Sequence, residues 1–205
     1  MYVPAKFRVG DDDAWRVVRD AGAGVLLRAT PSGLASVFVP VVVSDDLRTI
    51  TSHVARANPW CRAIEPGEEI LAVFLAASAY VSPSFYPSRL TNPKVVPTWN
   101  YVAAEVRGRV HVHEEHEWKL AQVRRQTERF EHGRSPEWRV DDAPAQYIDQ
   151  QLKAIVGLEI DVISVEGKAK LSQNRPVEDS TSVREHLESG SLTERNVAQR
   201  MDSDE

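Results

Sequence analysis

Residues 79–101 read AYVSPSFYPSRLTNPKVVPTWNY, and this stretch decides how the rest of the chain is interpreted. Four prolines divide it, and proline is excluded from the middle of a sheet because it has no N–H to donate to the ladder. Pro83 and Pro87 therefore close one strand, and Pro93 and Pro97 open the next. The stretch predicts two strands joined by a rigid, polar connection.

The same connection has the composition of a ligand-binding loop. Hydroxyls, amides and two cations beside flat rings suit a phosphorylated aromatic ligand. A decorated hairpin loop with buried tyrosines is the alternative, and composition alone leaves both open. The candidate binding residues here are Ser82, Ser84, Tyr86, Thr98, Trp99 and Asn100.

Working outward, the chain alternates short strands with turn residues, a pattern typical of a β-barrel or sandwich. Apolar and β-branched runs predict strands at 25–30, 34–43, 47–55, 70–82 and 158–165, with Pro40 indicating an edge position or a bulge. The run at 95–112 predicts either a strand pair or one strand that bends at Gly108. Apolar residues at helical spacing predict helices at 11–20, 116–130, 145–156 and 178–187. The predicted fold class is mainly β with flanking helices (α+β), with an antiparallel barrel.

The bulk numbers are those of a soluble globular protein with one main domain. The chain has 205 residues, 42% hydrophobic, a net charge of −5 and one cysteine, Cys61. An acidic chain is a poor nonspecific binder of DNA or of membrane surfaces. No leader is visible, and the longest apolar run, 70–80, is too short to span a bilayer. We expect a cytoplasmic protein with a domain over 1–189 and a polar tail over 190–205, weakly helical or disordered.

Two further clusters combine cations with neutral donors. His53, Arg56 and Asn58 lie in SHVARANPW, where the alternative is a turn with a solvated arginine. The basic segment GKAKLSQNR, at 167–175, supplies Lys168, Lys170, Gln173, Asn174 and Arg175 and could cradle an anion. Its alternative is a charged loop entering a helix.

A histidine pattern, HVHEEH at 111–116, makes a metal site conceivable. No cysteine or carboxylate is clearly placed to complete the geometry. The preferred interpretation is a solvated strand end, and we expect no metal.

Five segments together resemble the PaiB family of FMN-binding negative transcriptional regulators. They are MYVPAKF at 1–7, ARANPW at 55–60, SPSFY at 82–86, VPTWNY at 96–101 and GKAKLSQNR at 167–175. The resemblance covers most of the chain in the family's order. It implies an FMN-binding split β-barrel of Greek-key type, related in fold to pyridoxamine-phosphate oxidase. It also implies a homodimer with the flavin at the subunit interface.

FMN offers a phosphate, a polyol and a flat ring, and the candidate residues match each part. Arg56, Lys168, Lys170 or Arg175 could hold the phosphate, with His53 and Asn58 donating beside Arg56. Ser82, Ser84 and Thr98 could donate hydroxyls, and Tyr86, Trp99 or Tyr101 could flank the ring. Asn100, Gln173 and Asn174 could bind the pyrimidine edge, since an amide both donates and accepts.

The sequence departs from the family's usual pattern at four positions. Lys6, Phe38 and Glu105 stand where histidines are usual, and Phe85 stands where tryptophan is usual. Losing three titratable donors is compatible with flavin binding and argues against histidine-dependent chemistry or haem ligation.

The regulator label fits the residues less well than flavin binding does. No helix-turn-helix with a basic recognition helix is visible, and Arg124, Arg125 and Arg129 lie among glutamates. We therefore expect regulation to be indirect, through flavin chemistry or clearance of a small molecule. A flavin-dependent oxidoreductase and a non-catalytic ligand-binding module are the alternatives, and direct DNA binding is doubtful.

Overall fold

The structure, a computed structural model, describes residues 1–201. The chain forms two compact units. The first comprises Met1–Ala21, Phe74–Glu105 and the segment from Glu166 onward, and the second comprises Gly22–Val73 and Val106–Val165. Three long strands, β6 (Glu68–Val81), β7 (Thr98–His113) and β8 (Ile155–Lys170), contribute residues to both units.

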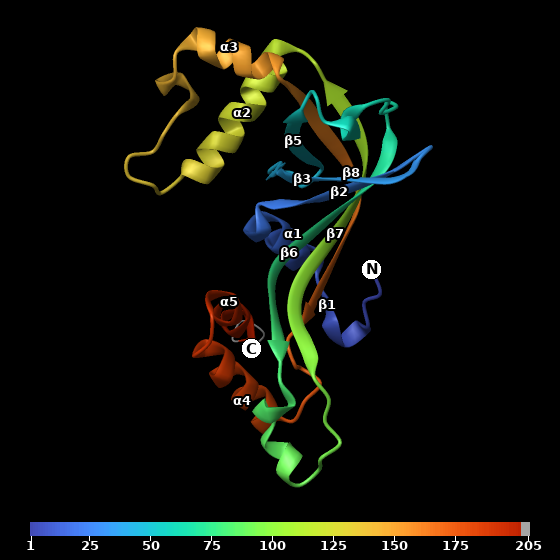
Figure 1. Ribbon diagram of the computed structural model, residues 1–205, viewed down its shortest axis with the longest axis vertical. Helices are drawn as coiled ribbons and strands as arrows, with labels where there is room; N and C mark the ends of the chain where they lie inside the picture. The colour runs from blue at the N-terminus through green and yellow to red at the C-terminus, as the bar shows by residue number, and fades with distance from the viewer. Residues whose placement is uncertain (202–205) are drawn as a thin grey trace. The chain divides into compact units, whose positions relative to one another are not determined.

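The second unit contains the barrel strands β2 (Ala23–Thr30), β3 (Gly33–Pro40), β4 (Val42–Val43) and β5 (Thr49–Ala55). The strand order is β3-β2-β6-β7-β8-β5-β4 (Figure 1). The two ends of this path, β3 and β4, are joined through the single residue Val41, and the Ser52 hydroxyl donates to the Pro40 carbonyl at 2.6 Å. The sheet is therefore open in its strand pairing, but its two ends meet along the chain.

Alternating burial explains why these segments are strands. On β5 the side chains of Ile50, Ser52 and Val54 are buried, and on β8 those of Val156, Leu158 and Ile160 are buried. The strands pair antiparallel, with Ile50 opposite Ile160 and Val54 opposite Val156. Buried, mostly apolar side chains recur at every second residue of both strands and lie on the same side of the sheet. They therefore belong to one core.

At Gly108 the backbone of β7 passes close to β8. A Cβ atom there would lie 2.4 Å from the Ile160 side chain and 2.7 Å from the Asp161 carbonyl oxygen. The sequence predicts a strand pair or one bent strand here; the structure has one continuous strand, and glycine at 108 leaves room for β8.

Helices α2 (His116–Glu131) and α3 (Ala145–Lys153) belong to the second unit (Figure 1). The first turn of α2 packs on β8 through Trp118. A Cβ atom at Gly157 would lie only 2.2 Å from the Trp118 ring. His113 also stacks on that ring, with centroids 4.1 Å apart and planes 5° apart. Glycine at 157 thus makes room for the helix to dock on β8.

The first unit packs helices on its part of the sheet. α1 (Asp11–Ala21) buries Ala14, Trp15, Val17 and Val18, and three aspartates in its first turn complement the helix dipole. β1 (Arg8–Val9) pairs with β8 opposite Lys168 and Gly167. α4 (Val177–Glu188) and α5 (Leu192–Met201) lie side by side (Figure 1).

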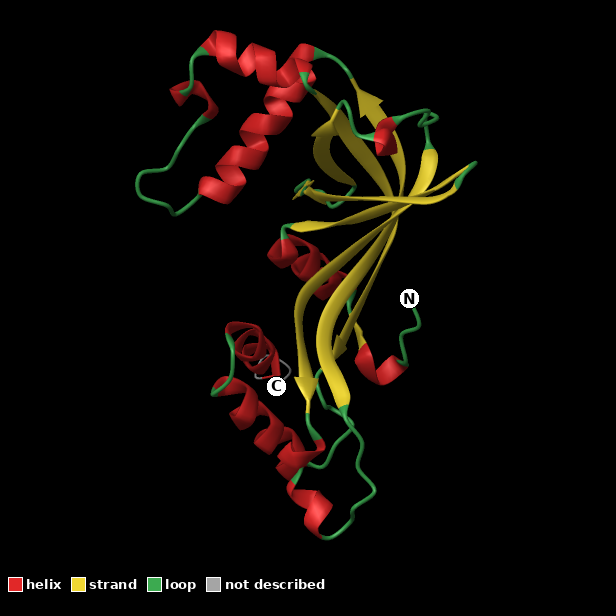
Figure 2. Cartoon of the chain, viewed as in Figure 1, coloured by secondary structure: helices red, strands yellow, loops and turns green. Residues whose placement is uncertain are grey.

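The connection between β6 and β7 is a loop with two short 3-10 turns, Pro83–Phe85 and Pro87–Leu90 (Figure 2). Two strands joined by a proline-divided connection were predicted here, and that prediction is confirmed. The fold class is also confirmed: the sheet is mostly antiparallel and carries five α-helices among residues 1–201.

Several boundaries differ from the sequence prediction. The helix predicted over 145–156 ends at Lys153, because Ile155 and Val156 enter β8 and pair with β5. β8 then runs to Lys170, so the first residues of the basic segment at 167–175 belong to a strand. The run over 34–43 is divided at Val41, next to Pro40, which agrees with the interruption predicted at that proline.

The polar end of the chain contains more structure than a frayed tail. Leu192–Met201 form α5, which buries Val197 and Ala198, and Arg200 pairs with Asp20 at 2.7 Å. Residues 202–205 lie outside the described residues. None of the helices within 1–201 combines the length and apolar character that crossing a bilayer requires.

Candidate functional site

The predicted binding residues are distributed over both units. His53, Arg56 and Asn58 belong to the second unit. The first unit holds Ser82, Ser84, Tyr86, Thr98, Trp99, Asn100, Lys168, Lys170, Gln173, Asn174 and Arg175.

Lys168 and Lys170 are two residues apart on β8, so their side chains share one face of the strand. The Lys168 ammonium donates to the Tyr2 carbonyl at 3.1 Å and lies 5.1 Å from the centroid of the Tyr101 ring. The Lys170 ammonium donates to the Trp99 carbonyl at 2.8 Å and to the Thr98 hydroxyl. The predicted residues Thr98, Trp99, Lys168 and Lys170 are therefore brought together on this face.

The same face carries exposed rings. Trp99 is 54% exposed and Tyr80 is 47% exposed, and the two rings meet edge to face with centroids 6.2 Å apart. Sequence reasoning missed Tyr80, although its place near the end of the apolar run that leads into the loop was a usable signal. A ligand ring lying on this face would find an aromatic surface beside the two lysines.

Positive charge is not neutralised within this cluster. Burial lowers the pKa of Lys170, and the nearby charges of Lys168 and Arg175 lower it further. Lys168 and Lys170 donate only to neutral oxygens, and no carboxylate of residues 1–201 forms an ion pair with them or with Arg175. An anion at this place would therefore be stabilised by three cations.

The turn that follows β8 is held by amides within the chain. Asn100 and Ser172 are buried and exchange two hydrogen bonds, of 3.0 and 3.2 Å. The Gln173 amide accepts from the Leu171 N–H at 2.7 Å and donates to the Ala169 carbonyl at 2.8 Å. Ser172 takes a left-handed φ of 70°, which a hydrogen-bonded turn can stabilise. These amides position the lysine face, whereas Asn174 is exposed.

Arg175 is positioned by Tyr86. The guanidinium carbon lies 4.5 Å from the centroid of the Tyr86 ring, a cation–π geometry. Tyr86 is fully buried, and burial raises the pKa of its phenol. The Tyr86 ring therefore contacts the Arg175 guanidinium and is not accessible to a ligand from solvent.

The proline-divided loop is attached to α4. Asp179, only 1% exposed, accepts hydrogen bonds from the Ser88 N–H at 3.0 Å and the Ser88 hydroxyl at 2.7 Å. Phe85 stacks on His186 with centroids 4.4 Å apart. Ser82 and Ser84 bond to each other at 2.7 Å and cap the first 3-10 turn. Sequence reasoning missed Asp179, which looked like an ordinary acidic residue in the first turn of a helix.

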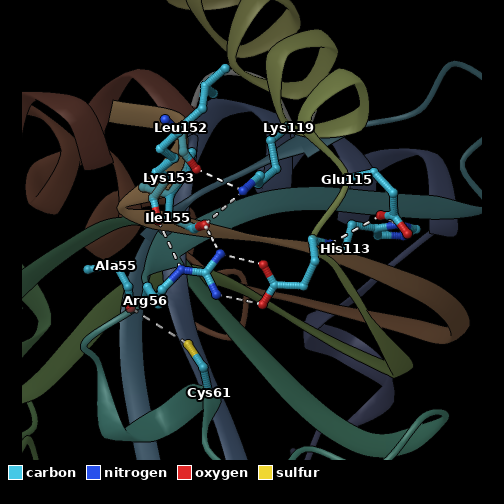
Figure 3. Close-up of polar contacts among 10 residues, drawn as sticks. Ala55, Arg56, Cys61, His113, Glu115, Lys119, Leu152, Lys153 and Ile155 are labelled. Atoms are coloured by element: carbon cyan, nitrogen blue, oxygen red, sulfur yellow. Dashed lines mark hydrogen bonds and ion pairs between the residues drawn. The ribbon is translucent and has the colours of Figure 1, made fainter. Parts of the chain in front are cut away.

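In the second unit Arg56 is already engaged. It donates to the Lys153 carbonyl at 2.9 Å and to the Ile155 carbonyl at 3.2 Å (Figure 3). Both ends of its guanidinium also pair with the Glu114 carboxylate, which raises the pKa of Arg56 and lowers that of Glu114. Arg56 would have to exchange Glu114 for a phosphate in order to bind one.

The neighbours of Arg56 have other surroundings. The Asn58 side chain accepts from the Trp60 N–H at 2.9 Å and so caps a 3-10 turn, Pro59–Cys61. The His53 Nδ1 atom is buried and has no hydrogen-bond partner among the described residues. Burial lowers the pKa of His53.

The histidine pattern at 111–116 resolves into separate contacts. His111 lies 2.9 Å from Asp161, His116 lies 2.9 Å from Asp149, and His113 stacks on Trp118. Within residues 1–201 no group of three or more metal-ligating side chains is found.

The sequence of this chain is similar to those of known proteins over most of its length. Residues 1–164 match the family described as "Putative FMN-binding domain". The chain is 30% identical to "Protease synthase and sporulation protein PAI 2" of Bacillus subtilis, over 92% of this chain and 89% of that protein. It is also 30% identical to an uncharacterised protein of Emericella nidulans, over 77% of this chain and 78% of that protein.

Solved structures with the same fold are more distant in sequence. A FAD and haem binding protein from Mycobacterium smegmatis superposes with a TM-score of 0.60 at 15% identity, covering 85% of this chain and 78% of that one. The flavocytochrome Anf3 from Azotobacter vinelandii gives 0.60 at 11% identity, covering 84% of this chain and 73% of that one. These likenesses support the predicted split-barrel fold.

Proposed function

This chain belongs to the family described as "Putative FMN-binding domain", and on that basis we propose that it is a PaiB-like flavoprotein whose cofactor is FMN. FMN is the cofactor that family membership supports. When bound, it supplies hydride and electron transfer. The chain's own residues would bind the flavin, orient it and exclude water from it.

The observation that carries the proposal is the cluster of Lys168, Lys170 and Arg175. The two lysines donate to neutral oxygens, and the arginine contacts a ring. No carboxylate among residues 1–201 pairs with any of these three cations, so the cluster carries uncompensated positive charge. A flavin phosphate supplies the missing charge, and the Thr98 hydroxyl lies beside Lys170 to donate a hydrogen bond. We assign the phosphate to this face in preference to Arg56, which Glu114 already neutralises.

The rings on the same face suit the rest of the cofactor. Trp99 and Tyr80 are half exposed, so a planar ring system can cover them and gain apolar contact. The exposed amide of Asn174 is free to read a polar edge, whereas those of Asn100 and Gln173 bond within the chain. The residues present therefore fit a flavin.

We propose that a second subunit completes the pocket. Large apolar side chains of the first unit stay exposed, among them Tyr2 at 84%, Leu75 at 57% and Trp99 at 54%. A homodimer that buries them would also shield the flavin from water. This proposal is in line with the family resemblance and is tested by the mass of the protein in solution.

We propose that this chain affects transcription only indirectly. The arginines of α2 do not form a basic face, because Arg124 pairs with Asp141 at 2.6 Å and the helix also carries Glu117, Glu128 and Glu131. Repression by direct DNA contact would need a surface that counters the net charge of −5. The cytoplasmic location stays a prediction.

The experiment is a visible absorption spectrum of the purified protein, with and without added FMN. A flavin spectrum that remains with the protein through gel filtration supports the proposal, and a protein that never retains FMN contradicts it. Reduction of the bound flavin by NADH or NADPH would distinguish an oxidoreductase from a binding module. An electrophoretic shift at physiological salt would restore direct DNA binding.

A further inference from the structure

Helix α4 holds the proline-divided loop through a buried carboxylate. Asp179 lies in the first turn of α4 and accepts from the Ser88 N–H at 3.0 Å and from the Ser88 hydroxyl at 2.7 Å. Each of its two oxygens takes one of these donors. A buried carboxylate is costly to desolvate, so its two charge-assisted hydrogen bonds fix Ser88 to the start of the helix.

The same helix makes a second contact with the loop, which runs alongside it (Figure 1). Asp179 and His186 are separated by seven residues, a spacing that places them on one face of α4. The His186 ring stacks on Phe85, with centroids 4.4 Å apart and planes 22° apart. The loop is therefore attached to α4 at Phe85 and at Ser88, on both sides of Tyr86.

Tyr86, between these two attachment points, contacts Arg175. Its ring is fully buried, and the ring centroid lies 4.5 Å from the guanidinium carbon of Arg175. Burial is the main reason that the pKa of the Tyr86 phenol is raised. The nearby charge of Arg175 opposes that rise, and the nearby charge of Asp179 adds to it. Both charged groups therefore lie close to the same ring.

The backbone of Arg175 is fixed by the helix. Arg175 precedes Pro176, the N-cap of α4, and its N–H donates to the Ser172 carbonyl at 2.9 Å. The start of α4 thus sets where the Arg175 side chain begins, and the loop supplies the ring against which its guanidinium lies. The hydrogen bonds between Asp179 and Ser88 join these two parts.

We infer that Asp179 is a positioning residue of the phosphate site. By holding Ser88 it keeps the Tyr86 ring against Arg175 and so directs that guanidinium toward the flavin phosphate. An arginine already held on a ring loses less side-chain freedom on binding a phosphate than a solvated arginine does. The inference rests on the flavin site proposed above and adds to it a residue that acts without touching the ligand. Asp179 therefore contributes to the affinity for the phosphate and not to the affinity for the flavin ring.

The test compares the affinities of the full chain for FMN and for riboflavin, measured by quenching of flavin fluorescence. We expect Asp179→Ala to lower the ratio of FMN to riboflavin affinity about fivefold or more, while the riboflavin affinity changes by less than about twofold. Asp179→Asn should recover most of the ratio, because its amide oxygen still accepts from Ser88. A residue with a merely structural role would change both affinities together or neither.

Glu194→Ala is the matched control. Glu194 accepts from the Ser191 N–H and from the Ser191 hydroxyl, both at 2.7 Å, so this variant removes a contact of the same kind from the first turn of α5. It should keep the wild-type ratio. Ser88→Ala removes one of the two hydrogen bonds from the loop side and should lower the ratio less than Asp179→Ala does. If Asp179→Ala does not fold, Ser88→Ala decides the question, and an unchanged ratio would then contradict the inference.

A double variant shows whether Asp179 acts through Arg175. Arg175→Gln should itself lower the ratio, and adding Asp179→Ala to it should have no further effect. Equal losses from Asp179→Ala with and without Arg175 would overturn the inference, and so would a wild-type ratio in either single variant. Those results leave FMN binding by the wild type intact. A wild-type protein that never retains FMN would instead contradict the proposed function and remove the inference with it.

Discussion

Lys170 shows how a single residue can prepare a site for an anion. Its ammonium is partly buried beside two other cations, and only neutral oxygens accept from it. The charged form of Lys170 is therefore less favourable in the flavin-free protein than in water, and a bound phosphate would stabilise it. The sequence showed the cations as a basic segment, but it could not show that part of the segment extends β8 and places both lysines on one face.

The lowered pKa of Lys170 predicts a pH dependence. Between that lowered pKa and the ordinary lysine value of about 10.4, the folded flavin-free protein binds fewer protons than the unfolded chain. Its free energy of unfolding should therefore rise with pH in this window, and Lys170→Met should reduce the rise. Denaturant unfolding at several alkaline pH values measures it. Lys94→Met, on the exposed loop, is the control and should keep the wild-type slope.

Arg28 is the residue on which the 58–63 loop depends. It is 5% exposed, and all five of its N–H groups are used, by both Glu68 oxygens and by the carbonyls of Trp60, Arg62 and Ala63. Arg28→Met should cost about 2–4 kcal/mol of unfolding free energy, because it leaves a carboxylate and three carbonyls without their donor.

Denaturant unfolding measures the Arg28 effect, and Arg62→Met, an exposed arginine of the same loop, provides the comparison. Equal stability of the two variants would mean that water replaces the Arg28 donors without cost. The sequence could not single out Arg28, since it reads as one polar residue at the end of an apolar strand.

At the scale of elements, the strands and most helices could be predicted because the spacing of apolar residues in the local sequence indicates which side chains are buried. Helix α2 was predicted to within one residue, and the proline-divided loop was predicted correctly. The predicted boundaries were wrong where pairing with a distant strand determines the secondary structure. Ile155 and Val156 continue a helical apolar face, yet pairing with β5 makes them part of a strand. Local spacing cannot distinguish those two outcomes.

The docking of α2 depends on the glycine beneath Trp118. Gly157→Ala would place a Cβ atom 2.2 Å from the indole ring, so we expect a loss of about 1–3 kcal/mol in unfolding free energy. Replacing Trp118 with leucine in the same chain should recover part of that loss. Gly10→Ala is the control, because a Cβ there meets nothing within 4 Å. Additive losses in the double variant would show that the two positions do not interact.

For the whole molecule, His53 predicts lower stability on mild acidification. Burial lowers its pKa, so between about pH 6.5 and that lower value the unfolded chain binds a proton that the folded chain does not. The free energy of unfolding should fall as pH drops through this window. His53→Gln should lessen the fall. The carboxylates with lowered pKa, such as those of Glu68 and Glu114, act only at lower pH.

The comparison for that titration is His132→Gln, whose side chain is 89% exposed. It should reproduce the wild-type dependence on pH. A wild-type curve that is flat over the same window, or one that His53→Gln does not alter, would show that the buried imidazole protonates as easily in the folded chain as in the unfolded one.

The central claim is that the uncompensated cations of the β8 face hold a flavin phosphate. The most direct measurement compares the affinities of FMN and riboflavin, which differ only in that phosphate, for the wild-type protein, Lys170→Met and Lys94→Met. We predict that the wild type and Lys94→Met prefer FMN by about 1–3 kcal/mol and that Lys170→Met loses most of this preference. Equal affinities in the wild type, or an undiminished preference in Lys170→Met, would contradict the claim.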